Sequence, residues 1–358
     1  MAEDFRSEEK KKEGVLYIGI DLGTSRTSVA ASNGVRETVW SYVGYPKDVV
    51  SRKLLKKDVL FGKEAVDKRL SLDLYRPFEK GIIKYSYEEN QEIPEEVIEK
   101  HMKAAKDLVR EALRVAKPRK DEYIYGVIGS PAQASIGNKS QIIEATRGVI
   151  DAVMVTSEPF AVAYGHELLE DTLVIDIGAG TVDLCRMHGT MPDEEDQITL
   201  PTAGDWLDQQ LHALFMRKAP NASISIHQVK DIKEKYAFVT DSAEPVRVEF
   251  IEDGKPTIYD ITDEIREGCR KIVPPIVKAI HKLVSTFDPD FQAKLRNNVL
   301  LGGGGSQING LGRVLEEAMQ QMLGSGRVKQ DEEPTYAGAN GALKMAHDMP
   351  EEFWKRLA

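Results

Sequence analysis

The sequence predicts an α/β protein made of two related domains, and three observations carry that prediction. A strand–Asp–x–Gly–turn pattern occurs twice, in Ile18–Ala30 (IGIDLGTSRTSVA) and again in Leu173–Leu184 (LVIDIGAGTVDL). Each copy is followed by a further strand, a helix, a buried strand, a glycine-rich turn and another helix. Strands that alternate with helices in this way are typical of α/β domains with mixed sheets, and 358 residues suffice for two of them.

The first copy is predicted to be a β-hairpin whose turn can hold an anion. An apolar run ends in Asp21, and Gly23, Thr24 and Ser25 then form a tight polar turn. The glycine lets the backbone approach a bulky charged group, and main-chain N–H groups with the two hydroxyls can cradle phosphate oxygens. Asp21 stands where a hydrated Mg²⁺ would bridge protein and phosphate. Taken alone, these residues fit an ordinary hairpin with a polar turn better than a phosphate-binding hairpin.

The second copy favours the phosphate-binding interpretation over a chance match. Its turn consists of Gly178, Ala179, Gly180 and Thr181. The positions that correspond between the copies are Asp21 and Asp176, Gly23 and Gly178, Ser25 and Gly180, and Ser28 and Asp183. Two such hairpins in one chain predict two domains that close on one nucleotide from opposite sides.

Turn residues and apolar periodicity predict the elements between the hairpins. An amphipathic helix is expected over Glu95–Lys117, where Pro118 ends it, and Ser157 is a natural N-cap for the helix in Ser157–Leu169. The other expected elements are a strand in Arg36–Tyr42, a turn in Gly44–Val50 that leads into a basic stretch, a strand becoming a short helix in Val59–Leu70, a buried strand and turn in Tyr123–Ser135, a helix in Asn138–Val149 and a strand in Ala152–Val155.

After the second hairpin the same kinds of signal continue. Asp260–Phe287 carries one long helix or two, because Pro274 and Pro275 either bend a helix or begin a new one. The other expected elements are helices in Ala203–Phe215 and Gln228–Val239, a β-hairpin in Val246–Tyr259, a strand, four glycines and a helix in Asn297–Leu323, and a closely packed Gly/Ala-rich helix near the end of the chain.

Composition excludes several classes of protein. The net charge of −10 argues against a general affinity for nucleic acid or anionic lipid. Cys185 and Cys269 lack metal-ligand spacing and fit buried residues in a reducing compartment. No apolar run approaches the roughly 18–20 residues that span a bilayer, and residues 1–14 are expected to be a charged, solvated tail.

Together these segments resemble the actin/Hsp70/sugar-kinase ATPase superfamily. The segments that carry the resemblance, in the order of the family, are Asp21–Ser28, Ser157–Gly165, Asp176–Asp183, Gly302–Ser306 and Tyr336–Ala346. The resemblance implies an actin-like two-domain fold, in which each domain is a mixed, RNase H-like sheet flanked by helices and ATP·Mg²⁺ binds in the cleft between them. Domain I would span 15–165, with 44–75 as a small subdomain and 331–358 completing it; domain II would span 166–330, with about 204–262 as its subdomain.

Other stretches resemble the MamK family of magnetosome-associated bacterial actins more closely. They include VGYPKDVV (Val43–Val50), VIGSPAQAS (Val127–Ser135) and the final DEEPTYAGANGALKMAHDMPEEFW. The first and last lie outside the nucleotide motifs, so catalysis does not dictate them. The resemblance implies an ATPase that polymerises into a double-stranded cytoplasmic filament, without inserting into a membrane, and aligns magnetosomes, with ATP hydrolysis driving filament turnover. It also points to magnetosome-associated adaptor proteins as partners.

The superfamily resemblance assigns roles to individual residues. Asp21 and Asp176 would hold Mg²⁺ through its water molecules, and Glu158 would activate or orient the attacking water. The alternative for Glu158 is a carboxylate that stabilises a helix N-terminus. Asp183 would assist through the water network.

The same resemblance places the nucleoside. In DIKEKY (Asp231–Tyr236) Lys233 would pack beside the base and Glu234 would hydrogen-bond the ribose. Without the phosphate turns, a solvated charged helix face would explain this pair better. Further contacts with base and ribose are expected from Gly204, Asp205, Asp208, Gly302, Gly303, Gly304 and Gly305.

Other functions remain open on the sequence alone. A cell-shape or plasmid-partition actin is one, although no apolar membrane-contacting segment is evident. An Hsp70-type chaperone would need a substrate-binding region after the ATPase, and a metabolite kinase would need an acceptor-activating Asp that the sequence does not identify. Polymerisation with ATP would separate the filament from both of these.

Overall fold

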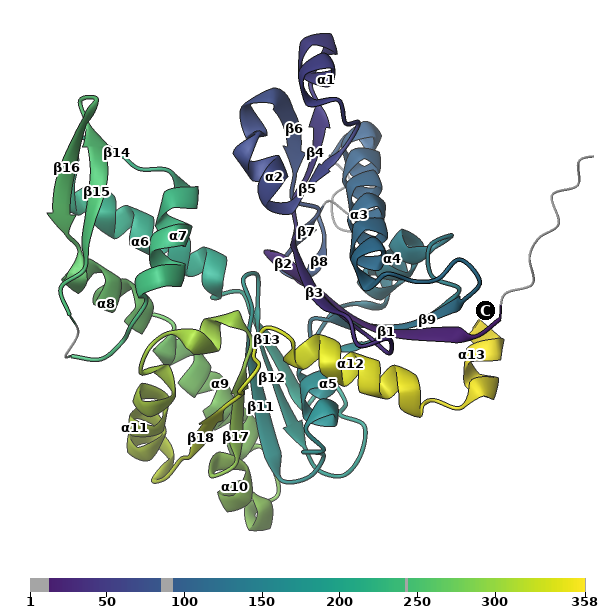
Figure 1. Cartoon of the computed structure of the whole chain (residues 1–358). Helices are drawn as coiled ribbons and strands as arrows, with labels where there is room; N and C mark the ends of the chain where they lie inside the picture. The colour runs from purple at the N-terminus through teal and green to yellow at the C-terminus, as the bar shows by residue number, and fades with distance from the viewer. Residues whose placement is uncertain (1–12, 85–92, 242–243, 358) are drawn as a thin grey trace, which may run out of the picture.

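Two five-stranded mixed sheets form the frame of the protein (Figure 1). The computed structural model describes residues 13–84, 93–241 and 244–357, so the expected tail lies almost entirely outside the described residues. In the first sheet the strand order is β10-β9-β1-β2-β3, with β1–β2–β3 antiparallel and β1–β9–β10 parallel. Its strands are β1 (Val15–Leu22), β2 (Arg26–Ala31), β3 (Arg36–Trp40), β9 (Tyr123–Ser130) and β10 (Ala152–Ser157).

The second sheet repeats the first strand for strand. Its order is β13-β12-β11-β17-β18, again with one antiparallel side and one parallel side. Its strands are β11 (Thr172–Ile177), β12 (Val182–Met187), β13 (Gln197–Leu200), β17 (Val299–Gly302) and β18 (Val328–Gln330). The predicted duplication is therefore present, and we call residues 13–165 the first half and 166–330 the second half.

The two halves meet along helices α5 (Glu158–Gly165) and α12 (Ala337–Asp348), which lie against each other between the sheets (Figure 1). Small residues make this contact possible. A β-carbon added at Gly341 would lie 1.7 Å from the carbonyl oxygen of Ala161 in α5. The first sheet approaches α12 as closely, since a β-carbon at Gly19 of β1 would lie 2.1 Å from the carbonyl oxygen of Ala339. The predicted close packing of the Gly/Ala-rich helix is confirmed. In α13 (Glu351–Leu357) the buried Trp354 stacks on Tyr125 at 5.3 Å between ring centroids.

Further helices cover the sheets. Ala105, Leu108 and Ala112, on the apolar face of the predicted amphipathic helix, pack into the core of the first half. The helices are α3 (Glu95–Ala116) and α4 (Ile136–Thr146) in the first half, and α9 (Val273–Ser285), α10 (Pro289–Arg296) and α11 (Leu311–Leu323) in the second. Within the described ranges, no helix combines the length and the apolar character needed to cross a membrane.

A smaller lobe extends from each half, and both point to the same side of the molecule (Figure 1). The first contains β4 (Val43–Pro46), α1 (Val49–Leu55), β5 (Leu60–Phe61), α2 (Gly62–Asp67), a 3₁₀ turn η1 (Arg69–Ser71) and β6 (Leu72–Tyr75), and the short strands β7 (Phe78–Glu79) and β8 (Ile82–Ile83) lead back to the sheet. The second contains α6 (Gly204–Lys218), β14 (Ala222–Ser223), α7 (Ile226–Tyr236), β15 (Arg247–Glu252), β16 (Lys255–Asp260) and α8 (Thr262–Arg270). The proposed domain limits remain a prediction.

Local expectations were wrong or incomplete at a few places. Gly44–Val50 is not a turn, because most of it forms β4 and the start of α1, and the first part of the basic stretch, Arg52 and Lys53, belongs to that helix. Asp48 and Ser51 cap α1 reciprocally: the Asp48 carboxylate accepts from Ser51 N at 2.8 Å, and the Ser51 hydroxyl accepts from Asp48 N at 2.9 Å. Ser157 occupies the N-cap position of α5, but its side chain makes no capping hydrogen bond. Asp260–Phe287 forms two helices, and its prolines lie in the first turn of α9.

Candidate functional site

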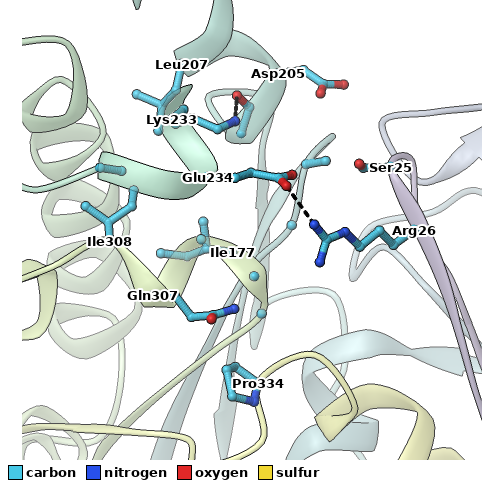
Figure 2. A pocket seen from close by; sticks show the side chains of 18 of the residues that line it. Ser25, Arg26, Ile177, Asp205, Leu207, Lys233, Glu234, Gln307, Ile308 and Pro334 are labelled. Atoms are coloured by element: carbon cyan, nitrogen blue, oxygen red, sulfur yellow. Dashed lines mark hydrogen bonds and ion pairs between the residues drawn. The ribbon is translucent and has the colours of Figure 1, made fainter. Parts of the chain in front are cut away.

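A cavity of about 780 Å³ lies between the two halves (Figure 2), and we call it the central cavity. Most residues predicted from the motifs line it. They are Asp21, Gly23, Thr24, Ser25, Glu158, Asp176, Gly178, Ala179, Gly180, Thr181, Gly204, Asp205, Lys233, Glu234, Gly303, Gly304 and Gly305. Asp183, Asp208 and Gly302 are not part of the lining. The two hairpins thus bring their turns to one space from opposite sides.

The two hairpin turns approach each other closely. A β-carbon at Gly180 would lie 2.3 Å from the hydroxyl oxygen of Thr24 and 2.7 Å from the α-carbon of Lys80. Only a glycine fits such an approach. The Thr24 hydroxyl also accepts a hydrogen bond of 2.9 Å from Gly81 N, which fixes its orientation. Residues of both turns therefore line the cavity next to each other, as a phosphate site between them requires.

Three carboxylates line the same cavity, and Asp176 is buried while Asp21 and Glu158 are partly buried. Burial and the nearby charge of Asp183 raise the pKa of Asp21 to about 6. Burial, and after it the charge of Asp21, also raises the pKa values of Glu158 and Asp176 well above their ordinary range. Carboxylates that repel one another in a buried site favour a bound cation, because a cation lowers the cost of their charges.

These oxygen donors fit Mg²⁺. Magnesium prefers carboxylate oxygens and keeps several of its water molecules, so one or two carboxylates are enough to hold it. Asp21 and Asp176 both line the cavity and supply such oxygens. Nowhere in the described part of the chain do three or more His, Cys, Asp or Glu side chains form a group that could hold a metal ion by themselves.

Asp183 accepts hydrogen bonds that the sequence did not predict. One of its carboxylate oxygens accepts hydrogen bonds from Ala132 N at 2.8 Å and from the Thr199 hydroxyl at 2.5 Å. Ala132 belongs to the loop after β9, so Asp183 ties the second sheet to the first half. Gln133, in the same loop, makes two hydrogen bonds of 3.1 Å with Thr199. Its main-chain N–H donates to the Thr199 hydroxyl, and its side-chain oxygen accepts from Thr199 N. Asp183 is buried behind the lining and lies outside the cavity.

The predicted nucleoside residues are held by ion pairs. Lys233 contacts the Asp208 carboxylate and donates to the carbonyl oxygen of Gly204, both at 2.7 Å. Asp208 therefore acts through Lys233, which lines the cavity beside the start of α6. Glu234 forms an ion pair of 2.7 Å with Arg26 from the first half, visible in Figure 2.

Sequence reasoning missed several residues of the site. Arg26 and Lys230 line the cavity, and Lys230 donates to the Ser25 hydroxyl across it. Arg26 lies inside the first hairpin motif, so its place was open to prediction, whereas Lys230 carries no motif of its own. Other lining residues to which the sequence assigned no role include Tyr236, Phe238, Glu244, Gln307, Ile308, Asn309 and Thr335.

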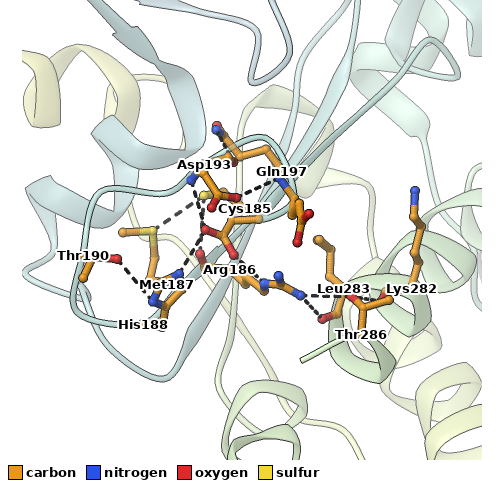
Figure 3. A network of polar contacts seen from close by, with 12 residues as sticks. Cys185, Arg186, Met187, His188, Thr190, Asp193, Gln197, Lys282, Leu283 and Thr286 are labelled. Atoms are coloured by element: carbon orange, nitrogen blue, oxygen red, sulfur yellow. Dashed lines mark hydrogen bonds and ion pairs between the residues drawn. The ribbon is translucent and has the colours of Figure 1, made fainter. Parts of the chain in front are cut away.

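A second polar cluster lies apart from the lining residues (Figure 3). The buried Arg186 pairs with Asp196 at 2.6 Å and donates to the carbonyl oxygen of Leu283 at 3.0 Å. Asp196 also contacts His188 Nε2 at 3.0 Å, and the guanidinium lies 4.8 Å from the ring centroid of Phe287. This cluster fixes the acidic loop before β13 against α9. Both cysteines are free and buried, as expected.

Comparisons with known proteins agree with this geometry. The sequence profile of the MreB/Mbl protein family matches residues 16–352. The chain is 35% identical over 349 residues to the actin-like protein MamK of Paramagnetospirillum magneticum, covering 98% of this chain and 97% of that protein. It is also 35% identical over 349 residues to actin-like protein MamK of Magnetospirillum gryphiswaldense, covering 98% of this chain and 94% of that protein.

Solved structures show the same likeness. A MamK double helical filament matches with a TM-score of 0.88 at 35% identity, covering 94% of this chain and 100% of that one. A non-polymerising mutant of MamK bound to AMPPNP matches with a TM-score of 0.69 at 34% identity, over 94% and 100% of the two chains. The predicted actin-like fold is confirmed. The chain belongs to the MreB/Mbl family and, within it, to the MamK-type actin-like proteins.

Proposed function

We propose that this protein is an ATPase that polymerises into a double-stranded cytoplasmic filament and aligns or positions magnetosomes. The observation that carries the proposal is the pair of matching hairpin turns, which face each other across a carboxylate-lined cavity. The structural match to a MamK double helical filament, with a TM-score of 0.88, supports the filament. Identical subunits form a filament when their head-to-tail contacts do not close into a ring. Magnetosome-associated adaptor proteins would connect filament and organelle.

The proposed site binds ATP with its phosphates between the turns. Main-chain N–H groups of Gly23, Thr24 and Ser25 would hold them from the first half, and those of Ala179 to Thr181 from the second. The N–H of Gly178 is not available, because it donates to the Thr181 carbonyl oxygen at 2.9 Å. Lys233 would lie beside the base and Glu234 would contact the ribose. Gly303 packs directly against Asp176, since a β-carbon there would lie 2.1 Å from its carboxylate. At Gly304 a β-carbon would meet no atom within 4 Å, so the nucleoside would have space beside this residue.

Hydrolysis would depend on the buried carboxylates. Asp21 and Asp176 would hold Mg²⁺, which neutralises the charge that develops on the phosphates. Glu158, the first residue of α5, lines the cavity and would orient the attacking water. Its pKa is raised by burial and by neighbouring carboxylates. Positive charge that reaches the site would favour the deprotonated form of Glu158.

The test is assembly of the purified full-length protein with Mg-ATP, compared with the same sample without nucleotide. Pelleting and negative-stain microscopy should show filaments only with nucleotide. Asp176→Ala is the matched variant, and it should weaken metal-dependent turnover while the protein stays folded. A monomer that hydrolyses ATP without assembling would contradict the filament proposal, and full activity of Asp176→Ala would contradict the proposed metal site.

A further inference from the structure

Polar contacts between residues that line the central cavity join the two halves. Arg26 pairs with Glu234, and Lys230 donates to the Ser25 hydroxyl. These four side chains all line the cavity, so a bound nucleotide would touch them directly. A further bridge between the halves has a different character, because its arginine is not part of the lining.

That bridge is made by Arg76, which directly follows β6 in the small lobe of the first half. Its Nε donates to the carbonyl oxygen of Thr24 at 2.7 Å. Its Nη2 lies 3.0 Å and 2.8 Å from the two carboxylate oxygens of Asp205 in the second half. The guanidinium also lies 5.8 Å from the ring centroid of Tyr42, which further restricts its position.

Asp205 continues the connection to the other turn. It is the second residue of α6, and its N–H donates to the carbonyl oxygen of Ala179 at 2.8 Å. The contacts therefore run from the first turn through Thr24, Arg76 and Asp205 to Ala179 in the second turn. About 70% of each ion-pair side chain is shielded, since Arg76 is 29% exposed and Asp205 is 31% exposed. Such a charge-assisted contact is stronger than an exposed one.

We propose that Arg76 is a positioning residue that couples closure of the two halves to the geometry of the two phosphate turns. The inference rests on the proposed nucleotide function of this site. When the halves separate, Asp205 moves away from Arg76, and the Thr24 carbonyl loses a fixed donor. The turns therefore reach their phosphate-binding arrangement together, in the closed state. By linkage, a nucleotide that binds this arrangement better also stabilises closure.

The segment between Arg76 and Gly81 supports the same role. Gly81 N holds the Thr24 hydroxyl, while the backbone of Lys80 lies against Gly180 of the second turn. Lys80 has a φ of 52°, in the left-handed region that non-glycine residues seldom adopt. Thr24 is thus held at its carbonyl by Arg76 and at its hydroxyl by Gly81. A change at Arg76 should disturb the turn without removing any atom from the cavity.

The experiment is a double-mutant cycle on the full-length protein with Arg76→Gln, Asp205→Asn and the combined variant. The readouts are the dissociation constant for a fluorescent ATP analogue with Mg²⁺, and kcat and KM for ATP. We expect each single variant to weaken binding about tenfold, as loss of one charge-assisted hydrogen bond does. The combined variant should bind no more weakly than the weaker single one. KM should rise while kcat stays within about twofold.

Matched controls separate this role from a loss of folding. Arg114→Gln removes an exposed arginine on α3 that pairs with Glu111 at 2.6 Å, and it should bind ATP as the natural protein does. Arg76→Lys keeps the charge without the planar fork and should be intermediate. Thermal unfolding without nucleotide checks each variant, and if Arg76→Gln is unfolded, Asp205→Asn and Arg76→Lys still report on the bridge.

The outcomes are distinct. Purely additive losses in the cycle would overturn the proposal, because Asp205 would then contact the nucleotide independently of Arg76. Unchanged ATP binding in Arg76→Gln would overturn it as well. A coupled cycle in a protein that never polymerises would support the bridge and reject the proposed filament. A natural protein that binds no ATP would reject both.

Discussion

The first and second hairpins have the same backbone but are held by different partners. In each hairpin the aspartate before the turn pairs with a residue of the returning strand. Asp21 pairs with Ser28 in the first hairpin, and Asp176 pairs with Asp183 in the second. Ser28 contacts only the neighbouring strand within the described contacts, at 3.4 Å from the Thr38 hydroxyl. Asp183 contacts the equivalent Thr199 and also Ala132 in the other half. The aspartate at position 183, where the first hairpin has Ser28, therefore adds a hydrogen bond between the two halves.

The two halves also differ in the helices that follow their last strands. Helix α5 begins with Glu158, which lines the cavity, whereas α12 begins with Ala337, and Pro334 and Thr335 line the cavity before it. A duplicated frame with unequal side chains can hold a ligand from two sides and still place a single water-orienting group.

The largest effect is expected from Glu158→Ala. Binding of ATP should persist, while hydrolysis slows about 100-fold or more, as loss of a general base does. Slower hydrolysis should also make filaments persist longer. Phosphate release and pelleting measure the two effects on the same sample. Glu158→Gln keeps the shape of the side chain and should be as slow, and turnover equal to the natural protein would remove Glu158 from the proposed role.

Asp183→Ser makes the second hairpin chemically like the first. The shorter side chain cannot reach Ala132, whose buried N–H is left without its acceptor, so the free energy of unfolding should fall by about 1–3 kcal/mol. Chemical denaturation without nucleotide measures this. Asp183→Asn retains an acceptor oxygen and is the matched control, with a smaller expected loss. Equal stability of Asp183→Ser and the natural protein would mean that the link contributes nothing.

Acid should weaken binding of Mg-ATP through the first hairpin. The pKa of Asp21 is raised to about 6, so the empty site takes up protons as the pH falls through that value. Metal binding needs the charged carboxylate, so affinity should fall as the pH drops below about 6, by about tenfold per pH unit for each proton displaced. Titration with a fluorescent ATP analogue from about pH 5 to pH 8 measures the slope. Asp21→Asn should flatten it, and a flat profile in the natural protein would contradict the prediction.

The smallest effect is expected from Ser28→Ala. Its hydroxyl makes a long contact between neutral groups, so the free energy of unfolding should change by less than about 1 kcal/mol. Denaturation beside Asp183→Ser gives a direct comparison of equivalent positions. A loss as large as that of Asp183→Ser would show that the two hairpins are supported equally after all.

The cavity-lining residues that short motifs identified are those whose chemistry is local. Asp21, Gly23 and their counterparts follow one another in a short motif, and a strand that ends in a tight turn fixes where they point. Local chemistry also limited Asp260–Phe287 to one bent helix or two helices, because proline cannot donate a hydrogen bond inside a helix. The structure has two helices there. Gly44 was misread because glycine suggests a turn, while here it allows Leu72 to approach: a β-carbon would lie 2.6 Å from its side chain.

The residues that were missed depend on partners distant in the chain. Arg76 reaches Asp205 across 129 positions, and Arg26 reaches Glu234 across 208. Neither spacing leaves a periodic signal, because the contact exists only after the halves have come together. Asp183 was assigned to the water network for the same reason, since its link to Ala132 cannot be read from either segment alone.

The contact between α5 and α12 has a mechanical consequence. A β-carbon added at Gly165 would lie 2.9 Å from the α-carbon of Gly341, so the two helices touch backbone to backbone with no side chain between them. We expect this contact to act as a hinge, and the lobes that carry α1 and β15–β16 lie far from it (Figure 1). A small rotation at the hinge would therefore produce a large displacement at the tips of the lobes. Whatever contacts those tips would therefore sense the contents of the cavity as a change of distance.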